Sequence, residues 1–190
     1  MTSNFWIIAP YVGWMALMTL LPSTPWAYAV RTLVTIALLF AGCRRWNVGP
    51  AKGILWGFIV GLAVLVIWIL PEQFNLPWYY RYFVIGEGGT QAIAESNALM
   101  IAIRLCGSAF VISIAEELFF RKWLIPFAGF WWMVALFAIE HDRYFVGALA
   151  GIIYGALYLK RGFWSAVVAH ATTNLALGIW VLTTQEWQFW

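Results

Sequence analysis

The feature that most constrains this chain is the recurrence of long apolar segments along its whole length, separated by short breaks. A helix needs about 20 apolar residues to span a bilayer, and the core of a soluble protein explains one such segment but not a series of them. Of the 190 residues 64% are hydrophobic and only 10% are charged, whereas soluble domains have about 25% charged residues. We therefore predict an integral membrane protein of the all-α class, a polytopic bundle of transmembrane helices in a single domain.

Seven apolar segments are predicted to be transmembrane helices, because prolines, glycines and charged residues separate them. They cover residues 5–21, 26–42, 54–70, 98–125, 130–141, 145–159 and 163–183. Pro71 is expected to end the third helix and Pro126 the fourth. The chain would then consist of residues 1–97, with the N-terminal helices and a loop, and residues 98–190, with the helices that carry the intramembrane polar residues.

Residues 71–94 differ in kind from the apolar segments. Two prolines and three glycines interrupt any helix there, and five aromatic residues surround Arg81. Tryptophan and tyrosine concentrate at membrane–water interfaces. We predict an interfacial loop with an aromatic belt, and we expect the other tryptophans and tyrosines to be interface anchors as well.

Lysine and arginine residues orient the predicted bundle. When the seven segments are threaded alternately, the basic residues between them fall on one face, which the positive-inside rule makes cytoplasmic. The N-terminus is then expected in the cytoplasm and the C-terminus outside. Arg31 and Arg104 fall inside apolar segments, where we expect them to snorkel or to be paired internally. The basic residues of the cytoplasmic face are Arg44, Arg45, Lys52, Lys122, Lys160 and Arg161.

Charge and cysteine content exclude two classes of site. The formal net charge of +3 and the lack of any Lys/Arg run argue against a nucleic-acid partner. Cys43 and Cys106 lie on different segments, so neither a disulfide framework nor a CxxC metal site is predicted.

Three ionised residues lie within the longest apolar segment: Glu116, Glu117 and Arg121. A charge in a spanning helix costs at least about 2.5 kcal/mol, so such residues usually face a protein interior or a cavity and mark a site. Glu117 and Arg121 are four residues apart and can pair, whereas Glu116 is turned about 100° away. The two carboxylates are therefore expected to have different roles.

The chain has two histidines, His141 and His170, and each belongs to a pattern with helical spacing. His170 and Asn174 are four residues apart, and so are Phe137 and His141, so each pair shares one face of a helix. Phe137 is expected to pack rather than to take part in chemistry.

The predicted helices deliver these ionisable groups to a similar depth. At about 1.5 Å per residue, Glu116 is roughly 14 Å and His141 roughly 18 Å from the turn at 126–129, and His170 is roughly 12 Å from Gly162. Scattered structural polar residues would have no reason to coincide in depth, so we predict one site.

The residue types at this depth favour hydrolysis by an activated water. A carboxylate in an apolar pocket holds a proton more tightly than in water, which suits a general base. Glu116 is the candidate base, with His141 holding or deprotonating the same water, while Glu117, held by its arginine, acts as a scaffold. His170 and Asn174 can donate N–H groups to the oxyanion that forms when water attacks an amide carbonyl. Peptide-bond hydrolysis is the predicted reaction.

Three motifs resemble those of a known family. EELFFR at 116–121, FAIEH at 137–141 and HATTN at 170–174 resemble, in order and spacing, the EExxxR, FxxxH and HxxxN motifs of the CPBP intramembrane proteases, the type II CAAX prenyl endopeptidase and bacteriocin-processing family. The resemblance covers about residues 98–180 and implies that residues 98–190 are catalytic helices. It implies an intramembrane endopeptidase in which Glu116 and His141 activate water and His170 and Asn174 form the oxyanion hole. The site residues that it implies are Glu116, Glu117, Arg121, His141, His170 and Asn174.

The short chain and its 14 tryptophans are similar to a bacterial branch of this family that is CAAX protease-related and associated with exosortase systems. This resemblance implies a location in the bacterial inner membrane. The expected partners are the lipid bilayer and a membrane-embedded or lipidated peptide substrate.

Other functions stay open at this point. A non-catalytic immunity or binding protein could use the same scaffold, with Glu117 and Arg121 as a structural ion pair. A haem held by the two histidines would leave the glutamates and Asn174 without a role. Serine chemistry is not expected, because the serines of this helix do not lie in a nucleophile-elbow sequence.

Metal dependence is the other open question. If zinc takes part, its ligands would be Glu116, His141 and His170, which would have to converge from three helices because the chain has no HExxH pair. We expect metal-free glutamate catalysis with no cofactor. Glu140 and Asp142, on either side of His141, also stay open as contributors.

Overall fold

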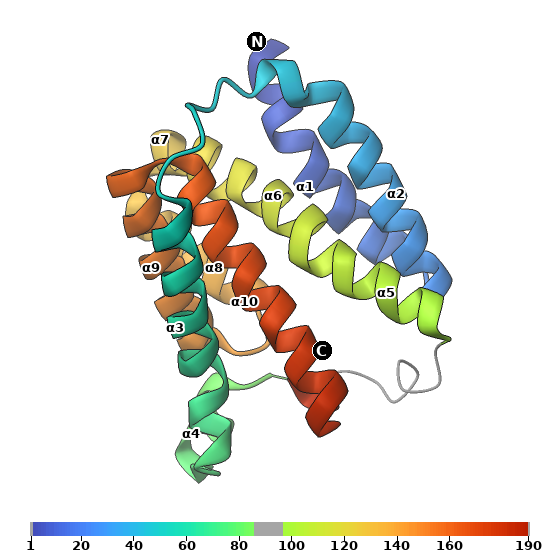
Figure 1. Cartoon of the computed structure of the whole chain (residues 1–190), viewed down its shortest axis with the longest axis vertical. Coiled ribbons are helices and arrows are strands. Elements are labelled where there is room, and N and C mark those ends of the chain that lie inside the picture. The colour runs from blue at the N-terminus through green and yellow to red at the C-terminus, as the bar shows by residue number, and fades with distance from the viewer. Residues whose placement is uncertain (1, 86–96, 190) are drawn as a thin grey trace.

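The computed structural model describes residues 2–85 and 97–189, and these residues form an all-α bundle (Figure 1). The helices of the first part are α1 (Thr2–Leu20), α2 (Pro25–Gly42), the 3₁₀ turn η1 (Cys43–Arg45), α3 (Ile54–Gln73) and α4 (Pro77–Phe83). A continuous helix follows, made of α5 (Ala98–Cys106), η3 (Gly107–Ile112), α6 (Ser113–Glu116), η4 (Glu117–Leu124) and α7 (Ile125–Ala128). The last elements are α8 (Phe130–Glu140), α9 (Tyr144–Arg161), α10 (Phe163–Thr184) and the 3₁₀ turn η5 (Trp187–Phe189).

In the described part of the chain, four helical segments are long and apolar enough to cross a membrane: Pro25–Arg45, Ile54–Gln73, Ala98–Ala128 and Phe163–Thr184. Asn4–Leu20 and α8 are apolar but shorter, and at 1.5 Å per residue the 11 residues of α8 rise only about 16 Å. The structure therefore supports an integral membrane protein with at least these four candidate spans, and the predicted seven crossings stay a prediction.

Two predicted helix ends are wrong. α3 continues through Pro71 to Gln73, and the fourth segment continues through Pro126 to Ala128 before Gly129 ends it with φ 96°. The predicted loop 71–94 contains the end of α3 and the short helix α4. Its three glycines, at 86, 88 and 89, lie outside the described residues.

The helices run alternately between two ends of the bundle (Figure 1). The end of α2, the helix α7 and the turn between α9 and α10 lie at the end nearer the N-terminus, whereas α4 and the C-terminus lie at the other end. The basic residues of the predicted cytoplasmic face thus gather at one end. Lys122, near the end of η4, connects this helix to the segment after η1, because its Nζ donates to the carbonyl of Asn47 at 2.8 Å.

The two arginines inside apolar segments both contact one aromatic ring. The guanidinium groups of Arg31 and Arg104 lie 5.6 and 5.1 Å from the ring centroid of Tyr28, and Arg31 also lies 5.6 Å from that of Trp14. Cation–π contacts of this kind stabilise a cation that has left water. They place both arginines in internal contacts, one of the two alternatives predicted for them.

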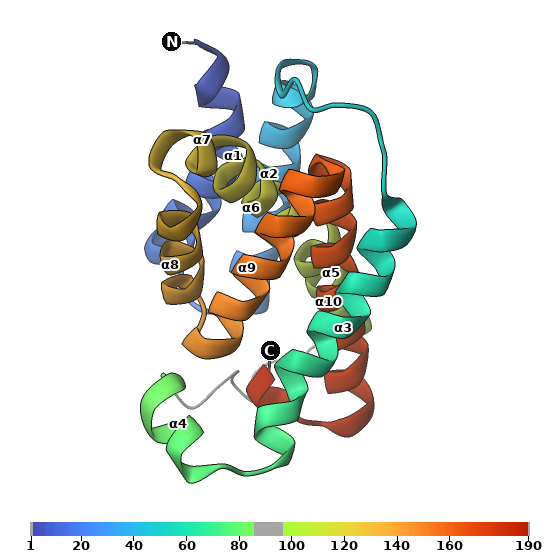
Figure 2. The same ribbon diagram turned by 90° about the vertical axis from the view of Figure 1, so that its left-hand side faces the viewer.

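α3 and α10 pack side by side with almost no space between their backbones (Figure 2). A Cβ atom at Gly61 would lie 2.5 Å from the carbonyl oxygen of Ala169, and one at Gly57 would lie 2.6 Å from that of Ser165. The hydroxyl of Thr173 donates to the carbonyl of Gly61 at 2.8 Å. Small residues at four-residue spacing thus bring α3 against the helix that carries His170, as in many membrane helix pairs.

We predict that Gly61→Ala lowers the free energy of unfolding by about 1–3 kcal/mol, because the new methyl group meets backbone that has no room to move. Denaturant-induced unfolding in detergent, followed by tryptophan fluorescence, measures the change. Gly49→Ala is the matched control, since nothing lies within 4 Å of a Cβ at Gly49. Equal stability of the two variants would contradict the close packing.

Candidate active site

The helix that carries the two glutamates contains two π-helical stretches, η3 and η4, on either side of Ser113–Glu116. π-Helical turns hold one residue more than α-turns and are frequent at functional sites. The hydroxyl of Ser113 donates to the carbonyl of Ser108, five residues earlier, at 3.2 Å. The glutamates are therefore presented by a helix whose backbone departs from α geometry on both sides of them.

Glu117 is the fully buried centre of the site. Its Oε1 accepts a hydrogen bond from Nδ1 of His170 at 2.9 Å, and its Oε2 lies 3.1 Å from Nε of Arg121. The side chains of Glu117 and Arg121 have no exposed surface. The predicted i,i+4 pair is thus present, and a second helix, α10, contributes the hydrogen-bond donor.

Aromatic rings surround the guanidinium of Arg121. Its carbon lies 4.2 Å from the ring centroid of Phe137, 5.6 Å from that of Tyr154 and 5.8 Å from that of Phe120. None of its nitrogens has a hydrogen-bond partner in the described part of the molecule. The cation is therefore stabilised by one carboxylate and by ring faces, and Phe137 packs as predicted.

His170 lies between the two glutamates. Its Nδ1 faces Glu117, its Nε2 lies 3.6 Å from Oε2 of Glu116, and its ring stacks on Tyr154 with centroids 5.0 Å apart. Glu116 is 7% exposed, and this Oε2 has no hydrogen-bond partner among the residues described. The two carboxylates therefore occupy different positions around one imidazole, in keeping with the expected 100° between them.

The hydrogen bond of His141 defines its tautomer. Nδ1 lies 2.7 Å from the carbonyl oxygen of Phe137, which can only accept, so Nδ1 carries the proton. Nε2 of the neutral ring is then left with a lone pair that can accept a hydrogen bond. The ring also meets the indole of Trp68 edge to face, with centroids 5.3 Å apart.

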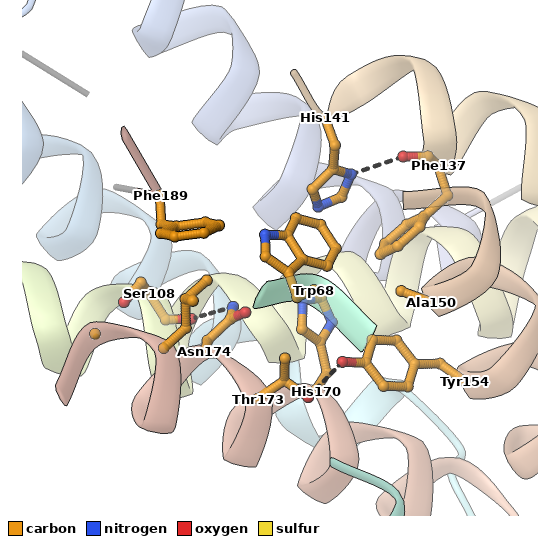
Figure 3. Close-up of a pocket in the computed structure, with 12 residues that line it drawn as sticks. Trp68, Ser108, Phe137, His141, Ala150, Tyr154, His170, Thr173, Asn174 and Phe189 are labelled. Atoms are coloured by element: carbon orange, nitrogen blue, oxygen red, sulfur yellow. Dashed lines mark hydrogen bonds between the residues drawn. The ribbon is translucent and has the colours of Figure 1, made fainter. Parts of the chain in front are cut away.

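A cavity of about 170 Å³ lies between these residues (Figure 3). His141, His170 and Asn174 line it, whereas the glutamates and Arg121 do not. Glu116 lies beside one of the lining residues, since its Oε2 is 3.6 Å from Nε2 of His170. The lining residues are Trp68, Ser108, Phe137, His141, Ala150, Tyr154, His170, Thr173, Asn174, Leu177, Gly178 and Phe189.

Asn174 is anchored to the glutamate helix. Its Nδ2 donates to the carbonyl of Ser108 at 3.0 Å and to the hydroxyl of Ser113 at 3.2 Å. Both N–H groups of the amide are used in this arrangement. As an oxyanion donor, the role expected for it, Asn174 would have to give up one of these bonds.

Sequence reasoning missed three aromatic residues of the cavity wall. Trp68 and Tyr154 were expected to be interface anchors, but both line the cavity, and so does Phe189. The hydroxyl of Tyr154 donates to that of Thr173 at 2.6 Å. A signal existed for Tyr154 alone, because the small residues Gly151 and Gly155 around it mark a closely packed helix face.

The structure bears on the zinc alternative in two ways. In the described parts of the chain, no three His, Cys, Asp or Glu side chains are grouped closely enough to hold a metal ion. Nδ1 of His141 and of His170 each face an oxygen acceptor, so Nε2 is the ring nitrogen that each histidine could offer to a metal ion. Metal-free catalysis by Glu116 therefore stays a prediction.

The part of the chain that carries the site matches a known family. Residues 98–176 match the model described as type II CAAX prenyl endopeptidase Rce1-like. This stretch is a domain of that family, as its three motifs predicted. No curated protein and no solved structure matches the chain.

We predict that Arg121→Met lowers the free energy of unfolding by about 3–5 kcal/mol, since it leaves Glu117 as a buried charge without its cation. The double variant Glu117→Gln/Arg121→Met should recover much of this loss, because it removes both charges. Unfolding in detergent measures both values.

Lys122→Met is the control for this pair, because Lys122 is the neighbouring cation and makes one exposed hydrogen bond. Its expected effect is about 1 kcal/mol or less. A double variant no more stable than Arg121→Met would show that the buried charge is not the reason for the loss.

Proposed function

We propose that this chain, whose residues 98–176 form an Rce1-like domain, is an intramembrane endopeptidase that uses glutamate-activated water. One observation carries the proposal: two buried carboxylates face the two ring nitrogens of His170, which lines a cavity. A structural ion pair needs only Glu117 and Arg121. Burying Glu116 as well costs free energy, and intramembrane carboxylates that a structural pair does not need usually mark a functional site.

In the proposed mechanism Glu116 is the general base. A water at the edge of the cavity beside His170 donates one hydrogen bond to Oε2 of Glu116 and the other to the lone pair on Nε2 of His141. The water oxygen attacks the peptide carbonyl carbon while Glu116 takes one proton. The carbon–nitrogen bond then breaks as this proton passes to the leaving amine nitrogen. General-base catalysis of this kind contributes about 10²–10⁴ in rate.

Glu117 and His170 stabilise the oxyanion in this scheme. Glu117 accepts a hydrogen bond from Nδ1–H of His170 and so orients the ring, and Nε2–H of the imidazolium form can donate to the carbonyl oxygen as its charge develops. Arg121 pairs with the carboxylate of Glu117 and offsets its negative charge. Asn174 is the second donor once its amide turns from Ser108 toward the substrate.

We further propose that the substrate is a membrane-embedded or lipidated peptide. The outward surface of the bundle supports contact with lipid, because large apolar side chains such as Leu33, Phe40, Leu55 and Trp131 are more than half exposed. All seven apolar segments would then lie in the membrane, in the orientation with the basic end in the cytoplasm of a bacterial cell.

A non-catalytic binding or immunity protein is the second candidate. The occupied amide of Asn174 and the absence of Glu116 from the residues that line the cavity favour it. A binding role predicts that substitution of Glu116 leaves every cleavage product in the membrane unchanged.

We predict that Glu116→Gln and His141→Ala each reduce peptide cleavage by about 10²-fold or more, because each removes a group that acts on the water. Comparison of the membrane peptidome of cells with the active and the substituted protein identifies the cleaved peptide and gives its rate of formation. Asp142→Asn is the matched acid-to-amide control, since Asp142 is exposed and should leave the rate unchanged. Full activity in both variants would rule out the mechanism.

Metal removal gives an independent test. Because the proposed chemistry uses only side chains, incubation of the purified protein with 1,10-phenanthroline is expected to leave the cleavage rate unchanged. A loss of activity that added zinc restores would replace the glutamate mechanism with a metal-dependent one.

A further inference from the structure

The segment after α10 turns back onto the bundle beside the cavity. Gln185, at φ 64°, ends the helix. The carboxylate of Glu186 then accepts from Nε2 of Gln73 at 3.2 Å and from Nε1 of Trp180 at 2.9 Å. These bonds tie the turn Trp187–Phe189 to the ends of α3 and α10.

Phe189 is the residue that this turn places in the cavity wall. Its side chain is 7% exposed and packs with Ile69, Leu177 and Val181. The guanidinium of Arg143 lies 4.9 Å from its ring centroid, and Nε of Arg143 pairs with Glu72. The ring is thus held by apolar contacts on one side and by a paired cation on another.

Figure 3 shows where Phe189 lies among the residues that line the cavity. The rings of Phe189 and Tyr154 lie at opposite sides of the group of lining residues, with Trp68 and His141 between them. The wall combines aromatic rings with three small or aliphatic residues, and its polar groups include those of the two histidines and of Ser108, Tyr154, Thr173 and Asn174.

The size of the cavity limits what it can hold. A cavity of about 150 Å³ lined by apolar side chains accommodates benzene, and this one measures about 170 Å³. One apolar side chain, such as that of phenylalanine or leucine, is of this size. A farnesyl chain has more than twice as many carbons as benzene, so a cavity of this volume cannot enclose it while Phe189 stays in place.

We propose that the cavity is the subsite for one apolar side chain next to the scissile bond, and that Phe189 sets its size and excludes prenyl chains. The assignment rests on the proposed function in one respect, namely that a peptide bond is cleaved beside His141. Phe189 is a specificity-determining residue in this assignment, and the preferred substrates are peptides with an unmodified apolar residue at the cleavage site.

The test measures protection of His141 from carbethoxylation, in which an unprotonated imidazole nitrogen attacks a carbonyl carbon of diethyl pyrocarbonate. The chain has two histidines, so mass spectrometry of the digested protein separates the two labels. The probes are N-acetylphenylalanine amide and N-acetyl-S-farnesylcysteine. In the unsubstituted protein the first is expected to slow labelling of His141 several-fold and the second to have no effect.

Two substitutions move the result in opposite directions. In Phe189→Ala the farnesyl probe should also protect His141, whereas in Phe189→Trp the phenylalanine probe should lose its effect. Phe74→Ala is the control, because Phe74 is 64% exposed and does not line the cavity. Elution from a size-exclusion column verifies that each variant is folded, and Phe189→Leu replaces Phe189→Ala if that variant is not.

Two results would overturn the subsite: equal protection by the farnesyl probe with and without Phe189, or no protection by the phenylalanine probe in the unsubstituted protein. Protection is measured in the Glu116→Gln background as well, where the proposed function allows binding without cleavage. Cleavage without this protection pattern refutes the subsite alone. The pattern without any cleavage refutes the protease and leaves a pocket that binds one apolar side chain.

Discussion

A carboxylate without exposed surface must be neutralised by its neighbours, and in this protein that requirement falls on Glu117. Removing one partner of a buried ion pair costs about 3–5 kcal/mol, which is a large share of the stability of any domain. Arg121 from the same helix and His170 from α10 meet the requirement, and the rings of α8 and α9 enclose the arginine. One buried charge thus fixes how four helical segments lie relative to one another.

The local part of this arrangement could be predicted from the sequence. Spacing along a helix determines which side chains share a face, so the pairing of Glu117 with Arg121 and the different direction of Glu116 followed from position alone. The prediction that helices end at Pro71 and Pro126 was wrong. Membrane helices tolerate proline where neighbouring helices or local π turns satisfy the freed backbone groups. The stretch Glu117–Leu124, which ends shortly before Pro126, is such a π turn.

Contacts between distant segments could not be predicted. Trp68 and Phe189 line the cavity, yet a tryptophan or phenylalanine near a helix end has the same local signal at a membrane interface as in a cavity wall. The bonds of Asn174 depend on a carbonyl on another helix. The spacing of the motifs thus predicted the polar residues of the candidate site. The residues of the cavity wall depend on how distant helices pack, which the sequence does not show.

The π-helical stretches on both sides of Ser113–Glu116 have a genetic consequence. A π turn differs from an α turn by one inserted residue, so deletion of a single codon in either stretch would turn the wide turn into an α turn. The side chains on the two sides of such a deletion would keep their relative directions. The same deletion in the α-helical residues Ser113–Glu116 would rotate every side chain beyond it by about 100°, so the effect of an in-frame deletion in this helix depends on which kind of turn loses the residue.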